Sequence, residues 1–139
     1  MAFRNPSDDA IRDILSQRRR IAVIGCSPDP RRDSHRVARL LIEKGHEVVL
    51  VNPQATEILG RACFRSLSDV PGAIDMVDVF RRSEHVAEIV EQAIEKKAAI
   101  VWTQLGVGDE AAAARARAAG LIVVMDRCPA IEYRRLFES

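Results

Sequence analysis

The stretch IAVIGCSP, residues 21–28, places four apolar residues directly before a glycine, and an amphipathic segment that opens at Ser34 follows it. A short buried strand that stops at a glycine and continues as a helix is typical of the first strand of a doubly wound α/β fold. Gly25 lets the backbone approach a ligand closely, and the positive end of the next helix favours an anion. We therefore expect a phosphate-binding turn at this point of the chain.

The alternation of apolar runs and amphipathic segments continues to the end of the chain. Near-continuous apolar runs are typical of parallel strands that are covered on both faces. The predicted fold is α/β: a Rossmann-like, doubly wound, mainly parallel sheet of five or six strands in a three-layer arrangement. The later strands are expected at residues 47–51, 75–80, 99–104 and 121–125, with a weak strand at 62–64, and the helices are expected to begin near Asp8, Ser34, Ser83, Asp109 and Ile131.

The composition bounds the class of protein. The 139 residues leave room for one domain with a hydrophobic core, so we expect residues 1–139 to form a single domain on which a helix within residues 1–18 docks. Lys and Arg number 21 against 20 Asp and Glu, which leaves no bulk charge to attract nucleic acid or a membrane surface. No apolar run approaches the roughly 20 residues that span a bilayer. We expect no nucleic-acid partner, no membrane partner and a cytoplasmic location.

Three widely spaced cysteines, Cys26, Cys63 and Cys128, form no pattern typical of a disulfide framework or a metal site. Cys26 has two interpretations: a reactive thiolate at a helix N-terminus, or a small residue that fits a tight turn, which we favour. A redox pair of Cys26 with Cys128 stays open as a hypothesis. His46 and His85 are isolated in the sequence, and we expect both at the surface.

Ligands of doubly wound sheets bind at the carboxyl ends of the strands. In this sequence those ends are rich in small residues, hydrogen-bonding side chains and arginine, and they hold a single carboxylate, Asp126. Such a surface suits a phosphorylated ligand better than acid–base catalysis, so we predict no catalytic residue and no metal ligand. The ends comprise Gly25-Cys26-Ser27, Asn52-Pro53-Gln54, Phe80-Arg81-Arg82, Thr103-Gln104-Leu105-Gly106 and Asp126-Arg127-Cys128.

A dinucleotide site is disfavoured at two places. The first turn keeps only Gly25 of the G-x-G-x-x-G pattern, and the second strand ends in Asn52-Pro53 where a ribose-binding acid is expected. NAD is therefore disfavoured. NADP stays open, because an arginine can take the place of that acid, although no arginine lies immediately after Pro53.

The strand ends resemble a known family, the stand-alone CoA-binding proteins. These are similar to the N-terminal CoA-binding domain of the succinyl-CoA synthetase α subunit and of NDP-forming acyl-CoA synthetases. The resemblance covers about residues 12–136, and its motifs come in the order of the family. The matching pieces are Ile24-Gly25-Cys26-Ser27, Val51-Asn52-Pro53, Val77-Asp78-Val79-Phe80-Arg81, Trp102-Thr103-Gln104-Leu105-Gly106 and residues 124–132.

The resemblance implies coenzyme A as the cofactor and assigns a part of it to each strand end. The turn at Gly25 would hold the pyrophosphate. Pro53 and the segment Phe80-Arg81 would flank the adenine and the 3′-phosphate, and the residues around Gln104 would line the pantetheine arm. Gln54 stands where relatives often carry a basic residue, and it can hydrogen-bond a phosphate but cannot neutralise it. The predicted CoA-binding residues are Gly25, Cys26, Ser27, Arg31, Arg36, Asn52, Pro53, Gln54, Phe80, Arg81, Thr103, Gln104, Leu105 and Gly106.

The favoured function is that of a non-catalytic CoA- or acyl-CoA-binding protein, with a small molecule as its ligand. In the larger enzymes that the chain resembles, a phosphorylated histidine and an ATP-grasp partner lie outside this domain, and the sequence contains neither. Two alternatives stay open. One is the CoA-binding subunit of a split acyl-CoA synthetase, whose partner protein is unknown, and the other is an NADP- or nucleotide-responsive regulatory protein.

Overall fold

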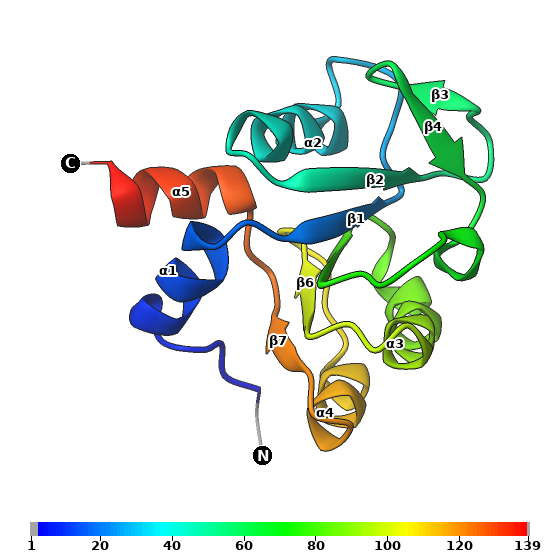
Figure 1. Ribbon diagram of the computed structural model, residues 1–139. Coiled ribbons are helices and arrows are strands. Elements are labelled where there is room, and N and C mark those ends of the chain that lie inside the picture. Colours follow the sequence, from blue (N-terminus) through cyan, green and yellow to red (C-terminus); the bar gives the residue numbers. More distant parts are fainter. Residues whose placement is uncertain (1–2, 139) are drawn as a thin grey trace.

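The computed structural model describes residues 3–138 (Figure 1). Strands and helices alternate along most of the chain, as the sequence predicts. The helices are α1 (Asp8–Ser16), α2 (Asp33–Glu43), α3 (Val86–Glu95), α4 (Glu110–Ala118) and α5 (Pro129–Phe137), with two short 3-10 helices, η1 (Leu67–Asp69) and η2 (Ser83–His85). The strands are β1 (Arg20–Ile24), β2 (Glu47–Val51), β3 (Glu57–Ile58), β4 (Arg61–Phe64), β5 (Met76–Val79), β6 (Ile100–Thr103) and β7 (Ile122–Val124).

The strands form a sheet in the order β3-β4-β2-β1-β5-β6-β7. Neighbouring strands are parallel except for β3 with β4. From β1 the chain builds the sheet in one direction through β2, and it then returns to build the other half from β5. The strand order therefore reverses between β1 and β5, where such sheets open a crevice at their carboxyl edge. The predicted Rossmann-like, mainly parallel α/β fold is confirmed.

In residues 3–138 the sheet has seven strands where five or six were expected. The six parallel strands agree with the prediction, and the additional one is β3, which pairs antiparallel with β4. Leu59 and Gly60 connect these two strands with φ angles of 55° and 70°, the positive values that a type I′ hairpin turn requires. Because leucine rarely adopts that conformation, the sequence carries no recognisable signal for this hairpin.

Two helical layers enclose the sheet (Figure 1). Helices α1, α2 and α5 cover one face, and α3 and α4 cover the other. Alternate side chains of each inner strand enter opposite layers, so both faces of the sheet are apolar. Among the described residues, no helix has the length and apolar character needed to cross a bilayer. The α1/α2/α5 layer holds Ile21, Val23, Met76, Ile100 and Trp102, and the opposite layer holds Ala22, Ile24, Val77, Val79 and Val101.

His46 is buried, so the expectation of a surface residue is wrong. Its ring joins α1, α5 and the start of β2: the backbone N–H of Arg19 donates to Nδ1 over 3.1 Å, and Nε2 lies 2.7 Å from the Tyr133 hydroxyl. Because that hydroxyl donates to the Leu15 carbonyl, Nε2 must carry the proton. Burial, with the positive charges of Arg19 and Arg18, lowers the pKa of His46. The neutral ring fits this bonding pattern.

Asp78 is a carboxyl group in the middle of the sheet. It lies on β5, in register with Val23 of β1 and Trp102 of β6, and it is completely buried. Neither carboxyl oxygen forms a hydrogen bond with another described residue. Burial raises the pKa of Asp78 from 3.8 to about 8, because an apolar layer disfavours the charged form. The group is therefore mostly protonated at neutral pH.

We expect Asp78 to make the folded chain less stable as the pH rises. Between its ordinary pKa of 3.8 and its folded value of about 8, the unfolded chain has lost a proton that the folded chain keeps, so the free energy of unfolding falls. Asp78→Asn removes this part of the pH dependence, whereas Asp13→Asn, at an exposed carboxylate of α1, leaves it in place. Urea unfolding across this pH range measures the free energy of unfolding of both variants. Equal pH slopes for the wild type and Asp78→Asn would contradict the assignment.

Candidate functional site

Gly25 ends β1 at the point where the strand order reverses. Its φ is 83°, and a Cβ atom there would lie 2.7 Å from the Phe80 carbonyl oxygen and 2.9 Å from Cδ of Arg81. The N–H of Gly25 donates to the Val51 carbonyl, and the N–H of Phe80 donates to the Ile24 carbonyl, both over 2.8 Å. The ends of β1, β2 and β5 are thus held together around a residue that must be glycine.

Side chains from α2 hold the turn that follows Gly25. The Ser27 N–H donates to the Ser34 hydroxyl over 2.9 Å, and Nδ1 of His35 lies 3.0 Å from the Ser27 carbonyl. Ser34, expected to open the helix, lies in its first turn, because α2 begins at Asp33. His35 is buried. The turn is therefore held by side chains of α2, and it faces the positive, N-terminal end of that helix.

Cys26 points into the core, away from solvent. Burial raises the pKa of its thiol to about 12, and the nearby Cys63 and Asp78 add to the effect. The thiol is therefore protonated at neutral pH, which supports the interpretation as a small residue in a tight turn over that of a reactive thiolate. The three cysteines are free. Within residues 3–138, no three His, Cys, Asp or Glu side chains gather as a metal site would need.

Asn52 and Thr103 shape the loops at the strand ends. The Asn52 amide donates to the Cys26 carbonyl and accepts from the Gln54 N–H, both over 2.8 Å, so it ties two loops together. Thr103 is buried, and its hydroxyl donates to the Val107 carbonyl over 2.7 Å. These polar groups are occupied by the protein itself, which makes both residues supports of the loops.

A series of hollows follows the carboxyl edge of the sheet, and each shares lining residues with the next. The first, of about 360 Å³, lies between Pro53, Gln54 and Arg65. Pro53 and Arg65 also line the second, of about 250 Å³, which reaches Gly25 and Arg81. This part of the series lies over the ends of β1, β2 and β4.

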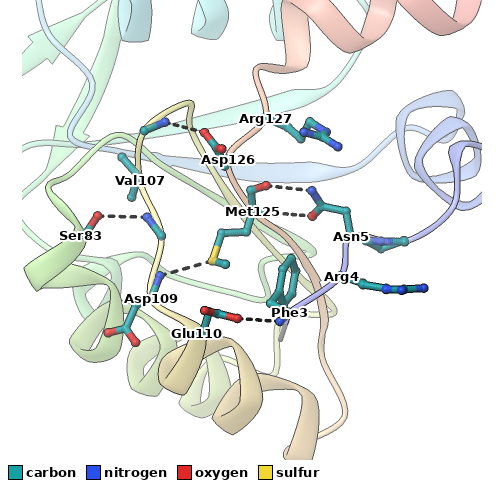
Figure 2. A pocket seen from close by; sticks show the side chains of 13 residues that line it. Phe3, Arg4, Asn5, Ser83, Val107, Asp109, Glu110, Met125, Asp126 and Arg127 are labelled. Atoms are coloured by element: carbon teal, nitrogen blue, oxygen red, sulfur yellow. Dashed lines mark hydrogen bonds between the residues drawn. The ribbon is translucent and has the colours of Figure 1, made fainter. Parts of the chain in front are cut away.

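The series continues over the other half of the sheet. Gly25 and Phe80 border a third hollow of about 360 Å³ at the start of α2. Phe80 and Gln104 line a fourth, also of about 360 Å³. A fifth and larger hollow, of about 920 Å³, shares Gly106 and Val107 with the fourth (Figure 2). The hollows therefore follow one another along the edge, an arrangement that suits an elongated ligand.

The structure brings nine of the predicted binding residues to these hollows, namely Gly25, Ser27, Arg31, Pro53, Gln54, Phe80, Arg81, Gln104 and Gly106. The remaining predicted residues, Cys26, Arg36, Asn52, Thr103 and Leu105, do not line these five hollows. Arg36 bonds instead to the Arg31 carbonyl and to Asp33, and Leu105 is exposed on the loop after β6.

Arg65 and His85 are lining residues that sequence reasoning missed. Arg65 directly follows β4, and its exposed side chain has no hydrogen bond or ion pair with another described residue. The sequence indicates only a weak strand at residues 62–64, and its direction in the sheet is not predicted. His85, which we expected at the surface, is half-buried, and its Nε2 lies 3.2 Å from the Arg81 guanidinium. Recognising β4 as parallel would have placed Arg65 at the carboxyl edge.

Gln104 carries an unused hydrogen-bonding group at the fourth hollow. The residue is 8% exposed, and its side-chain Oε1 is buried without a hydrogen-bond partner among the described residues. A buried polar atom without a partner costs free energy. A ligand that donates a hydrogen bond to this oxygen, once the side chain turns toward the hollow, would recover that cost.

We expect Gly25→Ala to destabilise the fold more than Gly45→Ala does. Both positions have positive φ, 83° and 95°, so alanine at either meets the left-handed strain of about 1–2 kcal/mol. At Gly45 nothing lies within 4 Å of an added Cβ, whereas at Gly25 the Phe80 carbonyl does. Urea unfolding should show a free energy of unfolding lower by at least a further ~1 kcal/mol for Gly25→Ala. Equal losses in the two variants would show that the close contact is not tight.

Comparisons with known proteins identify the family of this chain and proteins similar to it. Residues 19–134 match the model of a family described as CoA binding domain. The chain is 40% identical over 126 residues to the uncharacterized protein YneT of Bacillus subtilis, which covers 91% of this chain and 93% of that protein. It superposes with a TM-score of 0.91 on a solved hypothetical protein from Pyrococcus horikoshii OT3, with 41% identity and 98% of each chain covered.

A third similar protein is a subunit of an enzyme. The chain is 31% identical over 85 residues to the ADP-forming acetate–CoA ligase II subunit alpha of Pyrococcus furiosus. That match covers 60% of this chain but only 19% of the longer subunit. The similarity therefore concerns one part of the ligase subunit, and the ligase activity belongs to a much larger protein.

Proposed function

This chain belongs to the CoA-binding domain family, and on that premise we propose that it binds coenzyme A or an acyl-CoA along the carboxyl edge of its sheet. The family relationship to NDP-forming acyl-CoA synthetases and succinyl-CoA synthetase-like proteins, which the sequence motifs indicated, is confirmed. In this proposal the chain is a cytoplasmic CoA-binding protein that catalyses no reaction. Its three free cysteines suit a reducing compartment.

One observation carries the proposal: neighbouring hollows along the carboxyl edge share lining residues, and Gly25 lines two of them. CoA is an elongated ligand, with a nucleotide at one end, a diphosphate in the middle and a pantetheine arm at the other end. A mononucleotide would fill only part of the series. The third hollow, between Gly25 and the start of α2, suits the diphosphate, because the positive end of a helix favours an anion.

Arg65 supplies the positive charge that Gln54 lacks. Both residues line the first hollow, together with Pro53. A charge-assisted hydrogen bond from arginine to phosphate contributes about 1.5–3 kcal/mol when well formed. Arg31, by contrast, already donates two bonds to Asp29, at 3.1 and 3.0 Å. We assign the 3′-phosphate of CoA to Arg65 for this reason.

Gln104 supports the placement of the pantetheine arm. That arm contains two amide groups, each with an N–H donor, and the Gln104 amide oxygen is a buried acceptor without a partner. The fourth hollow, where Gln104 lies, connects Phe80 to Gly106. A pantetheine amide that reached this oxygen would satisfy it.

A binding role without catalysis is supported by the state of the titratable groups beneath the turn. Cys26 and Asp78 lie in the core beside the site, with pKa values raised to about 12 and about 8. Both are buried and line none of the five hollows. Protonated groups without access to a ligand are poor nucleophiles and bases.

The similarity to the ligase subunit favours a second candidate, a CoA-binding subunit of a split acyl-CoA synthetase. In that case a separate protein would supply the phosphorylated histidine and the nucleotide-binding parts. Co-purification with an ATP-grasp protein from cells would favour this candidate over a stand-alone binder. The third candidate is a regulatory protein that responds to NADP. It would bind NADP in preference to CoA, which a calorimetric titration distinguishes.

Calorimetric titration of the reduced protein with CoA, dephospho-CoA and NADP tests the proposal and the role of Arg65. We expect CoA to bind at least tenfold more tightly than dephospho-CoA, a difference of about 1.4 kcal/mol from the 3′-phosphate. Arg65→Gln should abolish this difference, whereas Arg61→Gln, at the other end of β4, should retain it. No heat with CoA would overturn the function. If Arg65→Gln still binds CoA more tightly than dephospho-CoA, only the assignment of the 3′-phosphate to Arg65 is overturned.

A second titration isolates the pantetheine arm. Gln104→Leu removes the buried acceptor, so we expect CoA to bind about fivefold more weakly, the equivalent of one net hydrogen bond of ~1 kcal/mol. Binding of adenosine 3′,5′-diphosphate, which has no pantetheine, should stay unchanged in the same variant. An equal loss for both ligands would show that Gln104 acts on the fold of the edge instead.

A further inference from the structure

The fifth hollow, which we call the terminal hollow, lies outside the predicted CoA-binding residues. It is lined by residues 3–6, by residues 106–110 after β6, by Ser83 and by residues 125–127 after β7 (Figure 2). Of the predicted binding residues, only Gly106 lines it. Its volume of about 920 Å³ is the largest of the five. This space has no occupant in the assignment of CoA made above.

The position of the terminal hollow follows from the strand order. Arg65 and Pro53 lie over β4 and β2, Gly25 and Phe80 lie over β1 and β5, and the terminal hollow lies beyond β6 toward β7. A CoA molecule with its nucleotide at Arg65 and its pantetheine at Gln104 therefore brings its thiol to the border at Gly106. Whatever is joined to that thiol enters the terminal hollow.

The N-terminal segment forms a fixed wall of this hollow (Figure 2). The Asn5 side chain donates to the Met125 carbonyl over 2.9 Å and accepts from the Met125 N–H over 2.7 Å. The Phe3 N–H donates to Glu110 over 2.6 Å. The Arg117 guanidinium lies 4.3 Å from the centre of the Phe3 ring. Contacts with Met125, directly after β7, and with α4 hold this wall in place.

The lining of the terminal hollow is mainly polar. Asp109 caps α4 by accepting from the Ala112 N–H, and Asp126 accepts from the Gly106 N–H over 2.7 Å. Each of these carboxylates retains a second oxygen for a ligand. Within the part of the chain that the structure describes, the Arg127 guanidinium has only a long ion pair of 3.7 Å, to Glu132. A long alkyl chain would remove these groups from water without replacing their hydrogen bonds.

We propose that the terminal hollow receives the acyl group of an acyl-CoA, and that it selects a short acyl group that carries a hydrogen-bonding substituent. This inference rests on the proposed function, since it places the thiol of CoA at Gly106. The protein then distinguishes an acyl-CoA with a polar acyl group from both free CoA and a fatty acyl-CoA.

Calorimetric titration of the full chain with CoA, 3-hydroxybutyryl-CoA and octanoyl-CoA tests this proposal. We expect 3-hydroxybutyryl-CoA to bind about fivefold more tightly than either of the other two, the effect of one net hydrogen bond. Gly108→Leu should remove this preference and leave CoA affinity unchanged. Gly108 and Met125 both line the hollow, and a Cβ at Gly108 meets the Met125 side chain at 3.3 Å, so a leucine there crowds the hollow. The φ of Gly108 is not positive, so the substitution causes no left-handed strain.

Two further variants complete the test. Ala114→Leu adds a leucine to the exposed side of α4 and should keep the preference. Asn5→Ala removes both bonds to Met125 and should weaken the preference without filling the hollow. If CoA, 3-hydroxybutyryl-CoA and octanoyl-CoA bind with equal affinity, the acyl site is overturned and the CoA site is retained. Tightest binding of octanoyl-CoA would overturn the selection for polar groups, and no binding of any ligand would overturn both proposals.

Discussion

The arrangement of the carboxyl edge of the sheet depends on one contact, in which the backbone of Gly25 packs against the Phe80 carbonyl. No side chain fits between them, so the ends of β1 and β5 approach closely where the strand order reverses. The bond from the Gly25 N–H to Val51 brings β2 to the same point. Gly25 lines two of the hollows, so the turn that follows β1 lies between them. The position of these two hollows depends on that close approach.

The fold was largely readable from the sequence because each inner strand is buried on both faces. Burial on both faces requires an apolar run, and the helices between the runs show one apolar stripe each. What could not be read depends on tertiary packing or on an unusual residue. Leu59 adopts a conformation that sequence rules reserve for glycine and asparagine. His46 is polar and next to a glycine, yet Tyr133, 87 residues later, provides the partner that buries it.

The candidate site was predictable at the level of strand ends and less so at the level of side chains. Backbone positions such as Gly25 and Gly106 reach the hollows because every parallel strand ends at the same edge. Cys26 and Thr103 come from the same strand ends but point inward, since successive side chains face opposite ways. Arg65 escaped notice because the strand before it has a weak signal. The wall at Asn5 was invisible to local patterns, because its partner Met125 is 120 residues away.

Asn5 has a consequence for how the molecule behaves among its own copies. Strand β7 has one neighbour, β6, so its outer side is an open edge of the sheet, and Ile122 on it is exposed. Open edges of this kind are templates on which another chain can add a strand. The Asn5 amide gives the end of this edge one donor and one acceptor, as the backbone of a further strand would. The segment that walls the hollow thereby occupies the carboxyl end of this open edge, at Met125, where a further strand would otherwise pair.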